Sequence, residues 1–439
     1  MQKTPFQKAT SYLAIAFTLS AFLAAIGCSG TSEINDDGAV PANASVSDDT
    51  SAAADDTSDT ADSTSTDEQT DDSITEETGG AATINVVAVG DNLVQTRVYE
   101  SALAHSDDGT SYNFQYCYEN IEPLINGDLN IINQETLICG EGYEITGSNY
   151  NFNSPEELGD AIIDIGFNVI TICNNHVLDK GESGLSSCLN YWDDKMEEYP
   201  DILVTGIYRD YVDMQNIRTK EVNGKTVAFL SYTENTNGYS LPDNSELEIV
   251  YTSQEDVIQS QIEAAKEIAD VVIVTCHWGN EDTYTVTDGQ KDLAQQKIVE
   301  WGADVILGTH SHVAHTMEYI TRSDGTQGFV FYSLGNFISA QTDNYNIIGE
   351  LADFDIVVDE NGGVSIKNVQ VSPVITQYDD GSLSNLRLYP YSMYTDELAS
   401  AHGLPYCTSS TSASTQIWGM DTIQELFSTS VPEEFRNWG

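Results

Sequence analysis

Between residue 81 and about residue 375, hydrophobic runs typical of strands alternate with stretches that have the spacing of amphipathic helices. Strands are predicted over Ile84–Val89, Leu129–Ile132, Asn168–Cys173, Thr226–Tyr232, Val271–Cys276, Asp304–Leu307, Phe329–Tyr332, Phe354–Val358 and Val364–Val371. Helices are predicted over Pro155–Ile165, Gly184–Glu198, Ser253–Ala269 and Gln290–Trp301. An alternation of this kind predicts an α/β sandwich with a mixed sheet.

Residues at the predicted boundaries support this assignment. Ser154 and Ser253 precede helical stretches, and each is predicted to cap its helix with a side-chain oxygen. The segments 222–225 and 361–363 contain Asn-Gly pairs, which predict hairpin turns between strands.

Residues 1–28 have the layout of a secretory signal, in which two lysines precede an apolar stretch from Tyr12 to Ile26. The last four residues, Ala-Ile-Gly-Cys, resemble a bacterial lipobox, whose cysteine is lipidated and becomes the mature N-terminus. We therefore expect a lipid anchor at Cys28 and a place on the extracytoplasmic face of the cell membrane. An ordinary cleaved signal with a chance cysteine is the alternative.

The next part of the chain has a very different composition. Residues 29–80 contain 15 acidic residues and no Lys, Arg or aromatic residue. Such a segment cannot bury enough apolar surface to fold, so we expect a disordered tether. Residues 81–375 are predicted to form the main domain. Residues 376–439 are a C-terminal extension, rich in Tyr, Ser and Thr, that either packs on the domain or forms a small helical appendage.

Charge excludes one class of partner. The chain has a formal net charge of −54, and residues 81–439 contain 55 acidic and 14 basic residues. A nucleic-acid-binding protein needs a basic patch, so we expect no nucleic-acid partner. The acidity does not identify a substrate, because a solvated surface explains it as well.

Beyond Cys28 the chain has six cysteines: Cys117, Cys139, Cys173, Cys188, Cys276 and Cys407. In an exported protein they could form disulfides, and their connectivity is open. Cys173 and Cys276 stand at predicted strand ends, where they could be soft metal ligands. Their spacing matches no zinc-binding CxxC pattern, so buried or disulfide-bonded roles are favoured.

Metal-type ligands occur where hydrophobic runs stop. Five segments show this: Gly90-Asp91, Asn133-Gln134-Glu135, Asn174-Asn175-His176, His277-Trp278-Gly279 and Gly308-Thr309-His310-Ser311-His312. Open α/β sheets build their sites at the carboxyl ends of strands, so these segments can converge. Two carboxylates, an Asn and three imidazoles would form a site for one or two divalent metal ions.

The segments differ in how specific they are. Asp91 and Glu135 are weak signals by themselves, because an acidic residue after a strand is often part of a turn. We assign Glu135 the role of bridging two cations. In the more distinctive string Asn174 to Gly181, an Asn supplies a neutral oxygen ligand and His176 can donate a proton to a leaving group. A helix-capping turn would explain one Asn but not the whole string.

The histidines give a further signal. His277 ends one hydrophobic run, and His310 and His312 follow another with i, i+2 spacing. Side chains two residues apart lie on one face of an extended backbone, so both imidazoles are predicted to point at one cluster. A single His at a strand end is more often structural, but three at two strand ends favour a metal site. His315 is better explained as a surface residue.

Taken together, these motifs resemble the CapA-like proteins of capsule and poly-γ-glutamate synthesis, which share the calcineurin-like metallophosphatase fold. The matching strings are Val89-Gly90-Asp91, Asn133-Gln134-Glu135-Thr136, Asn174 to Gly181, His277-Trp278-Gly279-Asn280-Glu281, Gly308 to Val313 and Tyr332-Ser333-Leu334-Gly335-Asn336-Phe337. They occur in family order over roughly residues 84–340. The resemblance implies a four-layer α/β/β/α sandwich, with two sheets between layers of helices.

The resemblance also implies roles for individual residues. One metal ion would be held by Asp91, Glu135 and His312. A second would be held by Glu135, Asn175, His277 and His310. The catalytic set would be His176, Asp91 and Asn175, with His176 near the leaving group. The metal ions implied are divalent Mn, Fe or Zn.

This chain departs from the family at several positions. Leu93 stands where typical metallophosphatases have a His, which predicts a weak or absent first metal. None of these departures removes a predicted ligand. Asn336, in the matching string that begins at Tyr332, is expected to lie beside the site.

Two functions fit these observations, both in capsule or poly-γ-glutamate biosynthesis. The first is a metal-dependent hydrolase or transferase that acts on an anionic polymer or a phosphoester. The second is a non-catalytic factor for polymer assembly or export. In either case a membrane-bound polymer synthase is a candidate partner.

Overall fold

The computed structural model describes residues 80–148 and 150–439. The predicted signal and lipid anchor, and the tether up to residue 79, lie outside the described residues. Within the part of the chain that is described, no helix is long and apolar enough to cross a lipid bilayer.

The first sheet has eight strands and is mixed. Its order is β18 (Arg387–Pro390), β17 (Val364–Gln377), β16 (Ile348–Val358), β1 (Ala82–Asn92), β2 (Leu129–Gln134), β5 (Val169–Thr171) and β6 (Leu203–Thr205), with β15 (Asn336–Ile338) also beside β1. From β1 to β6 the strands are parallel, whereas β16, β17 and β18 are antiparallel to their neighbours.

The second sheet has six strands, in the order β13 (Met317–Thr321), β14 (Gln327–Phe331), β12 (Val305–Thr309), β11 (Val271–His277), β9 (Lys225–Thr233) and β8 (Arg218–Val222). Its four central strands are parallel. Two small ribbons complete the strand set: β3 (Thr146–Gly147) with β4 (Phe152–Asn153), and β7 (Ile207–Tyr208) with β10 (Glu248–Ile249).

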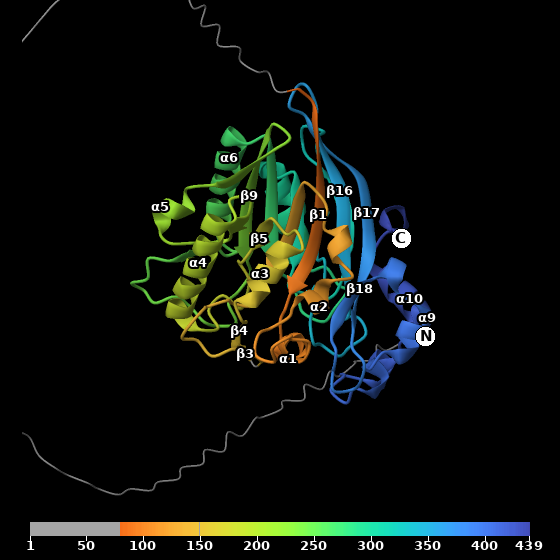
Figure 1. The fold of residues 1–439 in the computed structure, drawn as a ribbon. Coiled ribbons are helices and arrows are strands. Elements are labelled where there is room, and N and C mark those ends of the chain that lie inside the picture. The colour runs from red at the N-terminus through yellow and green to blue at the C-terminus, as the bar shows by residue number, and fades with distance from the viewer. Residues whose placement is uncertain (1–79, 149) are drawn as a thin grey trace, which may run out of the picture. The chain divides into compact units, whose positions relative to one another are not determined.

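The fold has four layers, and a hydrophobic core lies between each pair of neighbouring layers (Figure 1). One core lies between the two sheets. The outer face of the first sheet is covered by α1 (Thr96–Ala104), α2 (Gln115–Tyr118), α3 (Glu157–Asp164) and α4 (Gly181–Glu198). The outer face of the second sheet is covered by α6 (Glu255–Ile268) and by 288–301, with α5 (Tyr211–Met214) at the edge. The predicted four-layer α/β/β/α sandwich is therefore confirmed.

The C-terminal extension packs onto this sandwich. It contributes β18 to the first sheet and then forms α9 (Asp396–Ala401) and α10 (Met420–Ser430), drawn in blue beside β17 in Figure 1. Short 3-10 turns lie around them, over Tyr391–Met393, Leu404–Tyr406, Ala413–Gln416 and Glu433–Phe435. Ile423 and Phe427 of α10 are part of the core between the sheets.

Two predicted helix starts are wrong. The residues that precede α3 and α6 are Glu156 and Gln254, and neither makes a side-chain capping bond. Ser154 lies upstream of the residue that precedes α3, and its hydroxyl is paired with that of Thr136 at 2.8 Å instead. The predicted helix over 290–301 contains a π-helical stretch from Asp292 to Ile298.

The six described cysteines are buried, unpaired thiols. The favoured buried role is correct, and the disulfide alternative is wrong for the part of the chain described. Burial raises the pKa of the thiols of Cys173 and Cys276. Neither thiol is therefore an easily ionised metal ligand.

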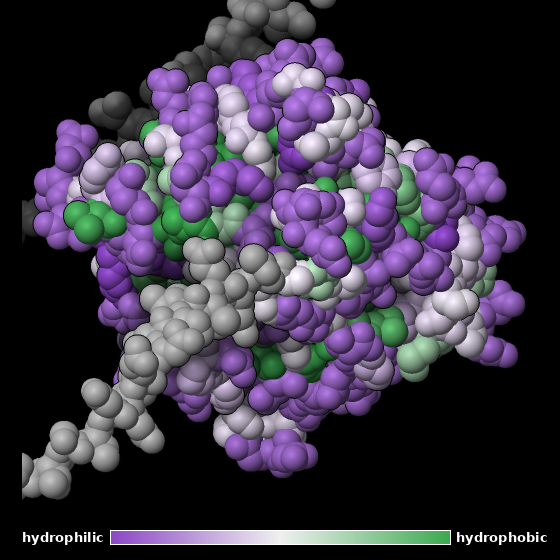
Figure 2. Space-filling model, turned by 90° about the horizontal axis from the view of Figure 1, so that it is seen from above, coloured by the Kyte–Doolittle hydropathy of each residue, from purple (hydrophilic) through white to green (hydrophobic). Residues whose placement is uncertain are grey.

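The outer surface agrees with the interpretation of the acidity. In the view from above, hydrophilic residues dominate, and hydrophobic ones show only as small separate spots (Figure 2). The face drawn is therefore a solvated surface, as the composition suggested.

One acidic side chain does not fit the apolar core that surrounds it. Glu350 lies on β16, on the same face as Ile348 and Ala352 of the core between the sheets. Neither carboxylate oxygen has a hydrogen-bond partner among the described residues. Burial raises the pKa of this carboxyl well above its usual range. Glu350 therefore costs stability when it is ionised.

Replacing Glu350 by leucine should raise the free energy of unfolding by about 1–3 kcal/mol at pH 8. A carboxyl with a raised folded-state pKa contributes stability below its unfolded pKa, and this contribution is lost as the pH rises. The increase in the free energy of unfolding caused by Glu350→Leu should therefore be smaller at pH 5 than at pH 8. Urea denaturation at the two pH values measures it, with exposed Glu360→Leu as the control. A leucine variant that is less stable at both values would contradict this.

Candidate metal centre

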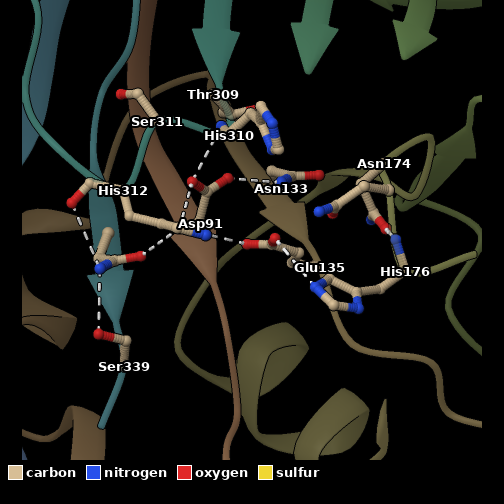
Figure 3. Close-up of polar contacts among 12 residues, drawn as sticks. Asp91, Asn133, Glu135, Asn174, His176, Thr309, His310, Ser311, His312 and Ser339 are labelled. Carbon is tan, nitrogen blue, oxygen red and sulfur yellow. Dashed lines mark hydrogen bonds and ion pairs between the residues drawn. The ribbon is translucent and has the colours of Figure 1, made fainter. Parts of the chain in front are cut away.

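Parallel strands of both sheets end at one place and carry the candidate ligands there. Asp91 lies near the end of β1, and Glu135 directly follows β2. His277 is the last residue of β11, and His310 directly follows β12. The predicted site residues are all buried: Asp91, Glu135, Asn175, His176, His277, His310 and His312. Figure 3 shows Asp91, Glu135, His176, His310 and His312 gathered in one cluster.

Two carboxylates stand at the centre of the cluster, and they differ in their bonding. Asp91 accepts hydrogen bonds from Asn133 Nδ2 at 2.7 Å and from the backbone N–H of His310 at 3.0 Å. Glu135 is fully buried, yet neither of its oxygens has a hydrogen-bond partner among the described residues. A buried carboxylate in this state is costly unless a cation binds it.

One group of donors surrounds Asp91 and Glu135. His312 Nδ1 lies 3.4 Å from Asp91 Oδ2 and 4.0 Å from Glu135 Oε2. One donor atom from each of these three residues lies within 4.8 Å of the others. Asn336 Oδ1 contacts the same imidazole nitrogen at 3.0 Å, so Asn336 does lie beside the site as expected. These three residues form a group that could hold a metal ion.

A second group converges on His277. Its Nε2 atom lies 3.0 Å from Asn175 Oδ1, 3.1 Å from His310 Nδ1 and 3.6 Å from Glu135 Oε1. Its other ring nitrogen lies 2.9 Å from the hydroxyl of Thr309, which fixes the orientation of the ring. Glu135 is thus adjacent to both groups, and its role as a bridging ligand stays a prediction.

The donor set fits divalent metal ions. Ligands held about 2.0–2.2 Å from one ion lie roughly 3–4 Å apart, and the three distances from His277 Nε2 fall in this range. Imidazole, carboxylate and amide oxygen donors suit Mn, Fe or Zn. The unpaired oxygens of Glu135 are the atoms that such ions would satisfy.

The pKa values of several titratable groups in the cluster are shifted in different directions. Burial, reinforced by Asp91, raises the pKa of Glu135 well above its usual range. Burial by itself would lower the pKa of His312, but the charges of Glu135 and Asp91 outweigh it and raise that pKa to about 10. Burial and the neighbouring imidazoles lower the pKa of His277 well below its usual range and that of His310 to about 4. His277 and His310 are therefore neutral near pH 7, as metal ligation requires.

His310 and His312 do meet at one cluster, but the reason inferred from their spacing is wrong. Strand β12 ends at Thr309, and both histidines have positive φ angles, 92° and 57°. The two imidazoles are therefore oriented by a strained loop and not by an extended backbone. Such strain persists only where the surrounding structure holds it, and it is common at functional sites.

His176 lies on the Glu135 side of the cluster, with Nε2 3.8 Å from Glu135 Oε1 (Figure 3). Its Nδ1 lies 2.9 Å from Asp179 Oδ2, which also accepts the backbone N–H of Phe152 at 2.8 Å. The ring of Phe152 packs edge-on against the imidazole at 4.6 Å between centroids. Asp179 and Phe152 together hold the ring so that Nε2 faces the carboxylates.

Two neighbours of the cluster were not predicted. Asn237 accepts a hydrogen bond from Asn175 Nδ2 at 3.3 Å, and its own amide nitrogen lies 3.4 Å from His176 Nδ1. Tyr150 stacks on the His176 ring at 6.1 Å. The Asn237-Gly238 pair signals a turn, but a local signal does not tell which site the turn borders. His315 is fully buried, so its interpretation as a surface residue is wrong.

Comparison with known proteins supports the pattern of motifs. Residues 85–341 match the family described as bacterial capsule synthesis protein PGA_cap. The chain is 29% identical over 266 residues to the capsule biosynthesis protein CapA of Bacillus anthracis, covering 59% of this chain and 60% of that protein. It is 28% identical over 235 residues to the PGA biosynthesis protein CapA of Bacillus subtilis strain 168, covering 53% and 58%. The match thus spans about three fifths of these relatives' length.

Solved structures with a similar arrangement of elements are remote in sequence. A putative 5′-nucleotidase from Staphylococcus aureus is 16% identical, with a TM-score of 0.42, covering 66% of this chain and 54% of that one. A calcineurin-like phosphoesterase, YfkN from Bacillus subtilis, is 11% identical, with a TM-score of 0.37, covering 67% and 90%. At these values the similarity says nothing about activity.

Proposed function

Because the chain belongs to the PGA_cap family of bacterial capsule synthesis proteins, we propose that it takes part in making a capsule polymer such as poly-γ-glutamate, as a metal-dependent hydrolase or transferase. The observation that carries the catalytic part is Glu135. Its carboxylate is buried without a hydrogen-bond partner among the described residues, between two groups of metal-type donors.

In this proposal the residues divide into two ligand sets. Asp91, Glu135 and His312 would hold one divalent ion. Glu135, Asn175, His277 and His310 would hold a second, and the ions would be Mn, Fe or Zn. Bound ions of this kind polarise a phosphoryl or carbonyl oxygen and activate water near neutral pH.

The chain's own side chains then position the reaction. Asn133 and the His310 backbone fix the Asp91 carboxylate, while Thr309 fixes the His277 ring. His176 has one nitrogen held by Asp179 and the other facing the carboxylates, so it is placed to give a proton to a leaving group. The substrate would be an anionic polymer or a phosphoester, and the bound ions would supply local positive charge in a chain whose formal net charge is −54.

The test is turnover by the purified full chain loaded with Mn²⁺ or Zn²⁺, on a generic phosphodiester and on amide-linked polyglutamate. Elemental analysis first establishes that metal is bound. Turnover of either substrate that EDTA abolishes is the expected result. A metal-loaded protein that turns over neither would rule out the catalytic proposal as stated.

A capsule-producing strain separates catalysis from assembly or export. If Glu135→Ala and His277→Ala both abolish polymer output as deletion does, the metal centre is needed for the role. If output is unchanged in the variants but lost on deletion, the chain acts as a non-catalytic assembly or export factor.

We also propose that the protein is anchored by lipid at Cys28 on the extracytoplasmic face of the cell membrane. The lipobox-like residues before Cys28 and the acidic segment 29–80 support this, and a membrane-bound polymer synthase is the partner that such a location would favour. Metabolic labelling with a fatty-acid probe tests the anchor, with Cys28→Ser as the control that should lose the label.

A further inference from the structure

A segment of the C-terminal extension is bonded to a loop that borders the metal centre. We call residues 409–417 the strap and residues 339–346 the site loop. Hydrogen bonds join them along their length, among them Ser410 Oγ to Thr342 O at 2.5 Å, Thr411 N to Asp343 Oδ1 at 2.8 Å, Thr415 Oγ1 to Asp343 Oδ1 at 2.6 Å, Asn344 N to Thr415 O at 3.1 Å and Asn344 Nδ2 to Ile417 O at 3.3 Å.

Asp343 is the main link between the two segments. It is 7% exposed, and one of its oxygens accepts hydrogen bonds from the backbone N–H and hydroxyl of Thr411 and from the hydroxyl of Thr415. Bonds to an ionised acceptor are stronger than those between neutral groups. The strap is itself fixed to the domain, because the neighbouring Trp418 donates to Tyr394 OH at 3.2 Å.

The other end of the site loop reaches the metal centre. The backbone N–H of Asn346 donates to Asp343 O at 2.9 Å. The side-chain amide of Asn346 donates to His312 O at 3.3 Å, and also to Asp282 Oδ1 at 2.9 Å. The carbonyl of Asn346 accepts from Asn336 Nδ2 at 2.9 Å, and the oxygen of that Asn336 amide lies 3.0 Å from His312 Nδ1.

His312 therefore has both its backbone and its ring held through Asn346. Its positive φ of 57° is a conformation that needs such support. The strap is thus connected to His312 in three steps. Thr411 and Thr415 bond to the Asp343 carboxylate, the backbone carbonyl of Asp343 accepts from the backbone N–H of Asn346, and the Asn346 side chain donates to the His312 carbonyl.

We propose that the strap is a positioning element of the metal centre, and that Asp343 is the residue through which it acts on His312. The proposal rests on the proposed function, since it takes His312 as a metal ligand. The strap and the site loop beyond residue 341 lie outside the residues matched to the family, so the family match does not account for them.

The test compares Mn²⁺ affinity of full-chain variants by competition with a fluorescent chelator. Removing a group that bonds directly to a metal ligand costs about 10–100-fold in affinity. Asp343 acts through one further residue, so Asp343→Ala should weaken Mn²⁺ binding by about tenfold and Thr415→Val by about threefold. Asp343→Asn keeps an acceptor oxygen and should restore most of the affinity.

Ser414→Ala is the matched control, because Ser414 is an exposed strap residue whose hydroxyl contacts Ser412 and not the site loop. Thermal unfolding of the metal-free proteins reports on folding, and the near-isosteric Thr415→Val keeps the test valid if Asp343→Ala folds poorly. Unchanged Mn²⁺ affinity in Thr415→Val and Asp343→Ala, with lowered unfolding temperatures, would overturn the proposal alone. A wild-type chain that binds no metal would overturn it together with the proposed function.

Discussion

Replacing Glu135 by glutamine should weaken Mn²⁺ binding at least about 100-fold, more than the loss expected for a residue outside the ligand set. Glutamine keeps the size of the side chain but removes the carboxylate whose unpaired oxygens lie near His312 on one side and His277 on the other. Isothermal titration with Mn²⁺ measures the loss directly.

The same substitution should not destabilise the metal-free protein. Burial and Asp91 raise the pKa of Glu135 well above its usual range, so an ionised Glu135 opposes folding when no cation is bound. The metal-free glutamine variant should unfold at the same temperature as wild type or higher. Addition of Mn²⁺ should raise the unfolding temperature of wild type but not that of the variant.

Glu281→Gln is the matched control. Glu281 is exposed, and its charge acts on Glu135 and His312 without belonging to either donor group. Its replacement removes one nearby negative charge, so Mn²⁺ affinity should fall by less than about threefold, in line with a screened surface charge. If the two glutamine variants lost affinity equally, Glu135 would act by its charge alone and not as a ligand.

Much of this architecture could be predicted from the sequence, because it depends on local patterns. Buried parallel strands are continuous hydrophobic runs, as in β1 and β11, and polar residues at their carboxyl ends mark the site. Asp91, His277 and His310 stand at such strand ends, and the structure brings them together.

The features that were missed depend on contacts between distant segments. The site loop and the strap are far apart in sequence, and each is a polar stretch with no periodicity, so nothing local indicates that Asp343 and Thr415 meet. The positive φ angles of His310 and His312 are likewise imposed by the surrounding structure and not by their own residue type. The sequence thus predicts that a residue lies at a strand end better than it predicts the direction in which its side chain points.

The contrast between local sequence patterns and contacts with distant residues also applies to helix starts. Ser154 has the residue type of a cap, but its hydroxyl is taken by Thr136, a residue beside the site. A partner 18 residues away competes with the local capping bond, and its presence cannot be inferred from the Ser-Pro pair.

Replacing His176 by asparagine should lower kcat about 10²–10⁴-fold on a phosphodiester with a poor leaving group, while Mn²⁺ affinity stays within about threefold of wild type. The reason lies in the two faces of the ring. One nitrogen is held by Asp179 at 2.9 Å, and the other faces Glu135 at 3.8 Å without belonging to either donor group of the proposed ligand sets. Such a side chain can deliver a proton without being needed to hold the ions.

A change of leaving group makes this prediction specific. A p-nitrophenyl ester releases an anion that needs little protonation, so the asparagine variant should lose much less activity on it than on an alkyl ester. Asp179→Asn should show the same dependence of kcat on the leaving group, with a smaller loss of activity. The His176 imidazole is still present in this variant, but it loses the carboxylate that orients it. An equal loss on both esters would mean that His176 positions the substrate instead of donating a proton. Loss of Mn²⁺ binding in the His176 variant would instead make it a metal ligand, and the boundary between the ligand sets and the proton donor would have to move.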